Sequence, residues 1–293
     1  MTRDFSGGPG VPAGPGAPVL AVDGLTVVTR AGRRVVDDVS FSVRAGERLG
    51  IIGESGSGKS LTALAVAGLL APGLAAEGSV RLSGTEVIGA PEATLNRVRG
   101  SAVSLVFQEP LSALDPLMRV GRQIAGPLRR HRGLRGAALQ DAVLGLMREV
   151  ALPEPDRLAR SFPHEMSGGQ RQRVAIAMAL ACDPAVLIAD EPTTALDVTV
   201  QAEILELLLR VVREHRTALV FVSHDMAVVS EVAERVLVMR TGTVVEEGAV
   251  GDVIAAPRHP YTRSLVDSAR ALDAALGGPP PAAGQDVTAV ERR

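Results

Sequence analysis

The densest group of residues that could do chemistry is a glycine- and serine-rich octapeptide. It reads Gly53-Glu54-Ser55-Gly56-Ser57-Gly58-Lys59-Ser60 and is followed by Leu61. Glycines let backbone N–H groups converge on phosphate oxygens, and a following helix adds its positive N-terminal end. Lys59 would reach the outer phosphates, and the Ser60 hydroxyl would meet Mg²⁺. The alternative is a turn with a chance lysine. The strand-like run before the octapeptide and the helix expected over 61–70 favour a triphosphate site, a P-loop.

Two adjacent acids follow another apolar run. Val186-Leu187-Ile188-Ala189 leads directly into Asp190 and Glu191. A central strand of an open α/β sheet delivers its C-terminal end to the ligand crevice. We therefore expect Asp190 to hold Mg²⁺, directly or through water, and Glu191 to polarise the attacking water, since phosphoryl transfer needs little beyond these parts. Solvated acids at a strand edge are the alternative, and the upstream P-loop makes it the weaker one.

A histidine ends a third apolar run. His224 follows 218–222 within Ser223-His224-Asp225. A lone histidine is more often a surface or satisfied core residue. At this sheet edge, where several polar groups converge, we expect His224 to contact the γ-phosphate or to orient Glu191 and the water.

The elements that must position these residues follow an α/β pattern. Short runs that are apolar on both faces are typical of central parallel strands, which helices cover on both sides. Such runs occur at 49–53, 103–107, 185–189 and 218–222. Runs at 19–28 and 35–43 predict an antiparallel layer, and 78–87 and 236–245 predict hairpins, the second turning at Thr241-Gly242. An arginine-rich stretch without strand runs, about 109–181, predicts an inserted helical subdomain with helices over 122–132, 139–150 and 168–182.

A further motif indicates a family. Met166-Ser167-Gly168-Gly169-Gln170 resembles the signature of the ABC ATPases, with Met166 where leucine is usual. Gln108 matches the Q-loop of that family, Thr194-Ala195-Leu196-Asp197 resembles its D-loop, and His224 its switch histidine. All stand in the family's order across about 19–254. The similar string Ser112-Ala113-Leu114-Asp115 follows Gln108 closely, so we assign it to the Q-loop region.

The resemblance implies a fold and a dimer. It implies a RecA-like P-loop NTPase fold, the ABC nucleotide-binding domain, with an antiparallel β-subdomain and the helical insertion. Gln108 would contact Mg²⁺ and the γ-phosphate. The signature residues Ser167, Gly168, Gly169 and Gln170, together with Asp197, would contact ATP held by the P-loop of a second subunit. A helix N-terminus with free N–H groups suits a γ-phosphate. A single chain would then have no complete site.

Further strings narrow the resemblance. Phe107–Pro116, Phe162–Glu165, Asp197–Gln201 and especially His259-Pro260-Tyr261-Thr262-Arg263 are similar to the oligopeptide, dipeptide and nickel importer branch. This implies transmembrane permease subunits, a second ATPase subunit (a paralogue or a copy), indirect action of an extracytoplasmic solute-binding protein, and a peripheral place on the cytoplasmic face of the cell membrane. The alternatives are a soluble ABC ATPase of DNA repair or translation and an efflux ATPase.

The sequence departs from the branch in two places. The family stacks an aromatic residue on adenine, but Thr29 stands at that position and the chain has no aromatic between Phe5 and Phe41. Apolar contact from Val28 or Val36 would replace the stacking, so we expect weaker discrimination of adenine. Many members of the branch also carry a cysteine cluster for an iron–sulfur centre. This chain has only Cys182, so we expect no such centre and a reducing compartment.

Composition limits the remaining possibilities. The net charge of -2 gives no electrostatic basis for binding nucleic acid, and 2% aromatic residues leave few stacking surfaces. The longest apolar stretch, 61–76, contains Gly68, Pro72 and Gly73 and is too short to span a bilayer. The first residues lack the apolar core of a secretory signal. We expect disordered Gly/Pro-rich tails at 1–18 and 275–293 and an importer-type C-terminal segment at 255–274.

Overall fold

The computed structural model describes residues 17–108, 113–194 and 196–275, the side chains as far as 271. The two tails that the sequence predicts to be disordered lie largely outside these ranges. Part of the predicted Q-loop region, 109–112, and one residue of the predicted D-loop, Ala195, lie outside them as well.

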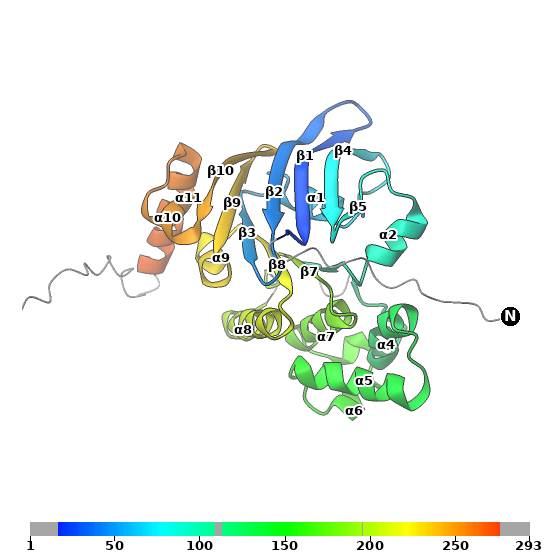
Figure 1. Ribbon diagram of the computed structural model, residues 1–293. Helices are drawn as coiled ribbons and strands as arrows, with labels where there is room; N and C mark the ends of the chain where they lie inside the picture. Colours follow the sequence, from blue (N-terminus) through cyan, green and yellow to red (C-terminus); the bar gives the residue numbers. More distant parts are fainter. Residues whose placement is uncertain (1–16, 109–112, 195, 276–293) are drawn as a thin grey trace, which may run out of the picture.

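A four-stranded antiparallel sheet forms the first layer, as 19–28 and 35–43 predicted. Its order is β2-β1-β4-β5. The bounds are β1 Leu20–Thr29, β2 Arg34–Val43, β4 Leu74–Leu82 and β5 Thr85–Glu86. β1 pairs antiparallel with both β2 and β4, and β4 and β5 form the predicted hairpin. Figure 1 shows this layer in the upper part of the molecule.

The second sheet has six strands in the order β10-β9-β3-β8-β7-β6. The bounds are β3 Arg48–Ile52, β6 Val103–Val106, β7 Val186–Asp190, β8 Ala218–Ser223, β9 Arg235–Arg240 and β10 Thr243–Ala249. Strands β9, β3, β8, β7 and β6 are parallel. The prediction of central parallel strands is therefore confirmed.

The edge hairpin of β9 and β10 turns where the sequence predicted. Its two central residues, Thr241 and Gly242, have φ of 48° and 88°. Two successive positive φ angles match the twist of a hairpin and are tolerated best with glycine present.

Successive residues of the parallel strands enter two different cores because side chains alternate across a strand. Ile52, Leu219 and Phe221 belong to a core shared with helices on one face. Ile51, Val220 and Val222 belong to a core on the other face, shared with the antiparallel sheet and with helix α1, Lys59–Val66. Because both faces are covered, the ends of the strands are the parts left open to a ligand.

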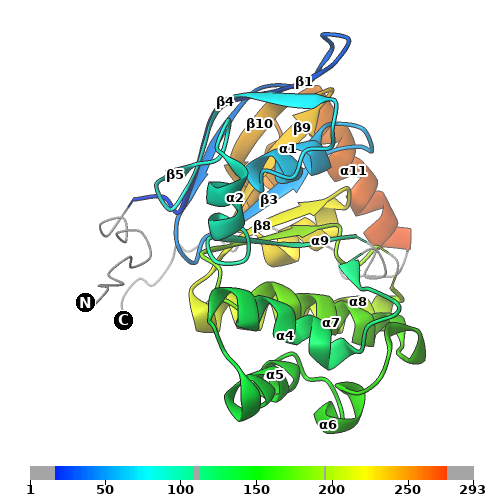
Figure 2. The same ribbon diagram turned by 90° about the vertical axis from the view of Figure 1, so that its right-hand side faces the viewer.

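Between β6 and β7 the chain is helical. This stretch holds α4 Val120–His131, α5 Gly136–Glu149, α6 Pro155–Leu158, η1 Pro163–Glu165 and α7 Gly168–Leu180. Each of the three helices predicted here is present within two or three residues of its expected ends. Figures 1 and 2 show these helices as a separate block below the sheets, with α8, Val198–His215, beside α7.

Several helices were not predicted from the sequence. They are α2 Glu92–Val98, α8, α9 Met226–Val232, α10 Val250–Ala255 and α11 Pro260–Ala275. The importer-type segment predicted at 255–274 is thus mostly the helix α11.

Candidate functional site

A cavity of about 600 Å³ opens where β3, β6, β7 and β8 end. Six P-loop residues line it, Glu54, Ser55, Gly56, Gly58, Lys59 and Ser60, together with Leu61, which follows the loop. Gln108, Glu191 and His224 line the same cavity, together with Thr194 and Leu265. The structure therefore brings together site residues that the sequence proposed up to 170 positions apart, from Glu54 to His224.

The P-loop backbone leaves space for an anion at the start of α1. The N-cap residue is Gly58, with φ of 101°, and no side chain caps this helix end. Gly53 is held so close to the neighbouring hairpin that a Cβ atom there would lie 2.2 Å from the Met239 carbonyl oxygen. Glycine is therefore needed at Gly58 for its backbone conformation and at Gly53 for its small size.

Lys59 lies buried beneath the loop. Its Nζ donates to the carbonyl oxygens of Gly53 and Glu54 at 2.7 and 2.9 Å. Burial lowers the pKa of Lys59, while the nearby carboxylates of Glu191, Asp190 and Glu54 oppose that shift. A partly desolvated ammonium beside the cavity interacts strongly with phosphate oxygens, because little water competes for it.

Ser60 and Asp190 present paired oxygens, the Ser60 hydroxyl donating to Asp190 Oδ1 at 3.0 Å. Asp190 is only 9% exposed. Burial raises its pKa, Glu191 adds to the rise, and the bond from Ser60 and the charge of Lys59 act against it. A hydroxyl and a carboxylate oxygen are hard ligands of the kind that Mg²⁺ prefers, and Gln108 adds a further oxygen in the cavity wall. This donor set fits Mg²⁺.

Glu191 is held in an unusual backbone conformation. Its φ is 47°, in the left-handed region, and its N–H donates to the Val222 carbonyl oxygen at 2.9 Å. The carboxylate accepts from the Thr194 hydroxyl at 3.1 Å and lies 3.1 Å from His224 Nδ1. His224 thus lies beside Glu191, and the role expected of it there stays a prediction. The geometry aims a carboxylate into the cavity, where it can accept a proton from water.

The signature residues lie elsewhere in the same chain. Ser167 is the N-cap of α7, and its hydroxyl accepts from the Gln170 N–H at 3.3 Å. The Gln170 side chain accepts in return from the Ser167 N–H at 3.1 Å, which completes a capping box. Among the described residues that line the P-loop cavity, none comes from Ser167–Gln170, and Asp197 is also not among them. Asp197 instead caps α8, its carboxylate accepting from the Val200 N–H at 3.0 Å.

Close packing joins these two helix starts. A Cβ atom on Gly169 would lie 2.6 Å from Val200 Cγ1, and one on Gly168 would lie 3.4 Å from Leu196 Cδ2. Gly169 therefore allows the start of α7 to approach α8, whereas a Cβ atom on Gly168 would make ordinary contact. Ser167 and Gly168 themselves remain exposed.

Two contributors to the site were missed from the sequence. Leu265, from α11, lines the P-loop cavity. Tyr261 receives a hydrogen bond from the Glu54 N–H at 2.7 Å. The signal available for Tyr261 was that it is the only tyrosine of the chain, inside a branch-specific string, but no local pattern connects it with residues 207 positions earlier.

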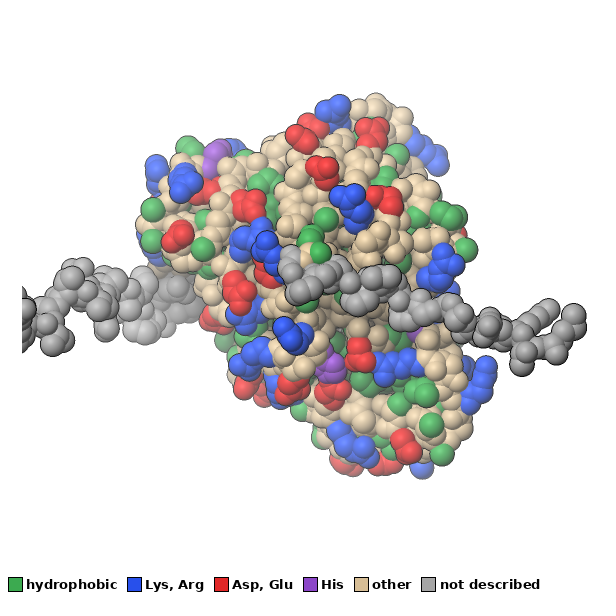
Figure 3. Space-filling model, in the orientation of Figure 1, with side chains coloured by type: hydrophobic (Ala, Val, Ile, Leu, Met, Phe, Trp, Pro, Cys, Tyr) green, Lys and Arg blue, Asp and Glu red, His purple; other side chains and the backbone are tan. Residues whose placement is uncertain are grey.

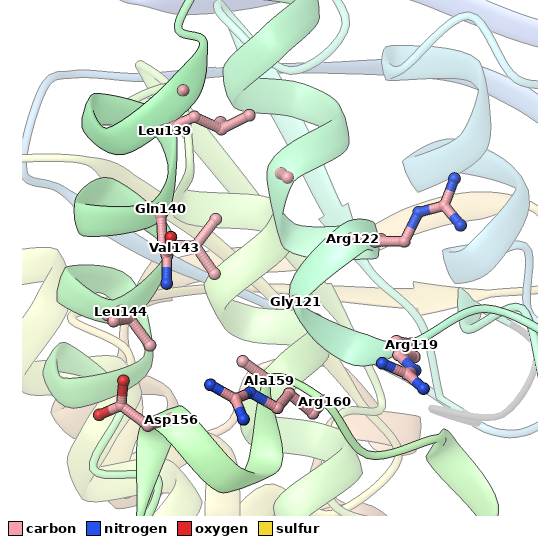
Figure 4. A pocket seen from close by; sticks show the side chains of 12 residues that line it. Arg119, Gly121, Arg122, Leu139, Gln140, Val143, Leu144, Asp156, Ala159 and Arg160 are labelled. Carbon is pink, nitrogen blue, oxygen red and sulfur yellow. The ribbon is translucent and has the colours of Figure 1, made fainter.

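A second hollow, of about 330 Å³, lies among α4, α5 and α6 (Figure 4). Leu139 and Val143 form part of its apolar floor, and Arg119, Arg122 and Arg160 stand around it. It contains none of the residues that the sequence proposed for nucleotide or metal binding. The mixed positive and negative side chains on the face in Figure 3 likewise form no single-sign surface there.

The fold and the cavity define a P-loop nucleoside triphosphatase. Residues 36–194 match the model of the ABC transporter family. The chain is 47% identical to the oligopeptide transport ATP-binding protein OppD of Escherichia coli over 82% of this chain and 71% of that protein. It is 44% identical to the dipeptide transport ATP-binding protein DppD of Haemophilus influenzae, over 80% and 72% respectively. The chain belongs to the ABC transporter family.

Solved structures agree with this assignment. A dimeric structure of the ATP-binding cassette MJ0796, in a post-hydrolysis state bound to ADP and Pi, superposes with a TM-score of 0.70. It is 30% identical and covers 79% of this chain and 98% of the other. The chain is thus an ABC-type ATPase whose nucleotide is ATP. No helix within the described ranges is both long and apolar enough to cross a bilayer.

Proposed function

We propose that this chain hydrolyses ATP at the cytoplasmic face of the cell membrane to drive import of peptides through permease subunits on separate chains. One observation carries the proposal. The P-loop, Glu191 and His224 meet in one cavity, and Asp190 is bonded to Ser60 in its wall, within a chain 47% identical to an oligopeptide transport ATP-binding protein. The named relatives favour this function over the alternatives in DNA repair, translation or efflux.

Within one chain, the P-loop would hold the triphosphate. Its backbone N–H groups and Lys59 would bind the phosphates, and Ser60, Asp190 and Gln108 would hold Mg²⁺. When bound, Mg²⁺ would neutralise the charge that develops on the phosphate oxygens. Glu191 would accept the proton of the attacking water, and His224, 3.1 Å from its carboxylate, would keep that carboxylate aimed.

The second part of the site would come from another subunit. Ser167–Gln170 start α7 away from the cavity, exposed in part, and would contact the γ-phosphate held by the partner's P-loop. Asp197 would act at the same subunit boundary. The partner would be a copy or a paralogous cassette, and the dimeric MJ0796 cassette supports such an arrangement.

The helical block would transmit the change to the membrane. We propose the nucleotide-binding domain at 19–254, its helical subdomain at about 109–181, and the C-terminal segment at 255–274 as the working divisions. Gln108 lies between the cavity and the helices that follow β6. Its contact with the γ-phosphate would couple nucleotide binding to the position of the helical subdomain. A difference in contacts to ATP and to ADP is what can shift such an equilibrium.

Reconstitution tests the proposal. The chain is assembled in proteoliposomes with its permease subunits and partner cassette, and ATP turnover and uptake are measured with a solute-binding protein loaded with an oligopeptide. We expect peptide-dependent turnover and peptide accumulation, both lost with Glu191→Gln. Stimulation by Ni²⁺ alone, or turnover that no permease changes, would contradict peptide import.

A further inference from the structure

The C-terminal helix α11 reaches the nucleotide site from the far end of the chain. It lies beside α9 at the margin of the parallel sheet (Figures 1 and 2). Leu265 on this helix forms part of the wall of the P-loop cavity. One turn earlier, the Tyr261 side chain is buried, with 6% exposed, and its hydroxyl accepts from the Glu54 N–H at 2.7 Å. The helix therefore touches both the cavity and the loop that forms it.

Several contacts fix the position of Tyr261. Its own N–H donates to His259 Nδ1 at 3.1 Å. The Glu246 carboxylate accepts from the N–H groups of Arg258 and His259 at 2.8 and 2.9 Å, which ties this turn to β10. The Arg240 guanidinium lies 5.0 Å from the centre of the tyrosine ring. The Arg240 contact and the bond from Glu54 act on the side chain itself, while the other bonds hold the backbone that carries it.

The hydroxyl acts on one peptide group of the P-loop. The Glu54 carbonyl oxygen accepts from Lys59, and the Glu54 N–H donates to Tyr261. Both backbone polar groups of Glu54 are thus hydrogen-bonded, the carbonyl to Lys59 beneath the loop and the N–H to Tyr261 of α11. A space of about 160 Å³ lies behind the loop, between Glu54–Ser57 and the side chains of Arg240 and Tyr261. Packing does not fill this space, so the hydrogen bond links Tyr261 to the loop directly. The β9–β10 turn makes a separate link, in which the Gly242 N–H donates to the Ser57 carbonyl oxygen at 3.0 Å.

We propose that Tyr261 is a positioning residue for ATP, which braces the entrance of the P-loop through the Glu54 N–H and so couples the C-terminal helix to phosphate binding. The inference rests on the assignment of the P-loop as the ATP site and goes beyond the proposed transport. A preorganised backbone binds its ligand more tightly because less ordering remains for the binding step. Burial raises the pKa of Tyr261, so the group that meets the Glu54 N–H is the neutral phenol.

Tyr261→Phe in the full chain tests the contact, because it removes the hydroxyl and keeps the ring. A lost hydrogen bond of this kind corresponds to about a 3- to 10-fold change in binding. We expect the Kd for the Mg²⁺ complex of the nonhydrolysable analogue AMP-PNP, measured by calorimetry, to rise by that factor. In the chain assembled with its partner subunit, the KM for ATP should rise with it while kcat stays within about twofold, since Glu191 and Asp190 are untouched.

The matched control is Ser268→Ala, which removes one hydroxyl bonded to the Ser264 carbonyl oxygen two turns along the same helix. We expect its Kd and KM to equal those of the wild type. Thermal unfolding without nucleotide separates positioning from stability, because a purely structural role would lower Tm and leave KM unchanged. A Tyr261→Phe chain that binds AMP-PNP as tightly as the wild type would overturn the role of Tyr261 alone. A wild-type chain that binds none would overturn the ATP site itself.

Discussion

Two helices of this chain, α1 and α7, begin at glycine-rich segments, and their first turns are capped in different ways. At α1 the N-cap is Gly58, and no side chain caps the helix. At α7 the N-cap is Ser167, and a reciprocal capping box with Gln170 uses donors at that end. Since the first N–H groups of any helix lack partners within it, the two ends differ in what remains for a ligand.

The surroundings of the two helix starts differ as well. The P-loop at α1 is supported from beneath by the buried Lys59 and from the side by Tyr261, and it faces a cavity with Glu191 and His224. The start of α7 is exposed at Ser167 and packs only its glycines against the α8 region. We interpret the start of α1 as the site that binds the phosphates of the chain's own nucleotide. We interpret the start of α7 as a preformed surface that contacts the nucleotide bound by a partner.

The largest expected effect comes from the cavity at α1. Glu191→Gln keeps the size and hydrogen-bonding capacity of the side chain but removes the base. We expect ATP turnover to fall at least ~10²-fold, because a positioned general base typically contributes at least that factor to the rate. ATP binding should be retained. Lys59→Ala, by contrast, should lose affinity for ATP. Turnover by Glu191→Gln near the wild-type rate, measured as phosphate release, would refute the assignment of the base.

A smaller effect is expected at α7. Ser167→Ala removes both the cap of the helix and the hydroxyl proposed to contact the γ-phosphate. A hydrogen bond to a charged group corresponds to roughly 10- to 100-fold in rate. We therefore expect turnover of the assembled dimer to fall by at least about tenfold, while ATP binding by the isolated chain stays unchanged. Ser161→Ala, in the same helical block, is the control, and equal turnover of the two variants would remove Ser167 from the site.

The smallest effect concerns stability and pH. Burial raises the pKa of Asp190, so the folded chain holds this proton more tightly than the unfolded chain. The resulting stability is present at low pH and is lost as the pH rises through the raised pKa, because the ionised form is then buried. Asp190→Asn removes that penalty. Without nucleotide, its Tm should exceed that of the wild type by on the order of a few degrees at pH 8.

The gain in Tm should shrink as the pH falls through the raised pKa and Asp190 becomes protonated in the wild type. Asp267→Asn, at an exposed position of α11, is the control and should show no such trend. A Tm difference that is constant across this pH range would show that the ionisation of Asp190 is not its source.

Much of the site at α1 was predictable because it depends on local patterns. A strand followed by Gly53–Ser60, and strands that end in Asp190 and His224, place side chains at one edge of a parallel sheet whatever the rest of the chain does. The contacts of Tyr261 and Leu265 were not predictable in this way. They depend on where α11 packs, and that packing has no periodic signal linking it to the P-loop.

The fold shows the same division. The central strands and the three main helices between β6 and β7 follow from apolar periodicity. The helix α8 was missed because its N-cap residue, Asp197, is also the last residue of the predicted D-loop, although Asp197 is an ordinary N-cap residue. The short helices α9 and α10 carry too few turns to show a period.

The central claim is that α1 of one subunit and α7 of another complete one ATP site. The most direct measurement is ATP turnover per chain over a range of chain concentrations, alone and with the paralogous cassette added. We predict that turnover per chain rises with the concentration of its partner, whether copy or paralogue, and approaches zero at high dilution. Full turnover per chain at every dilution, with no partner present, would contradict the claim.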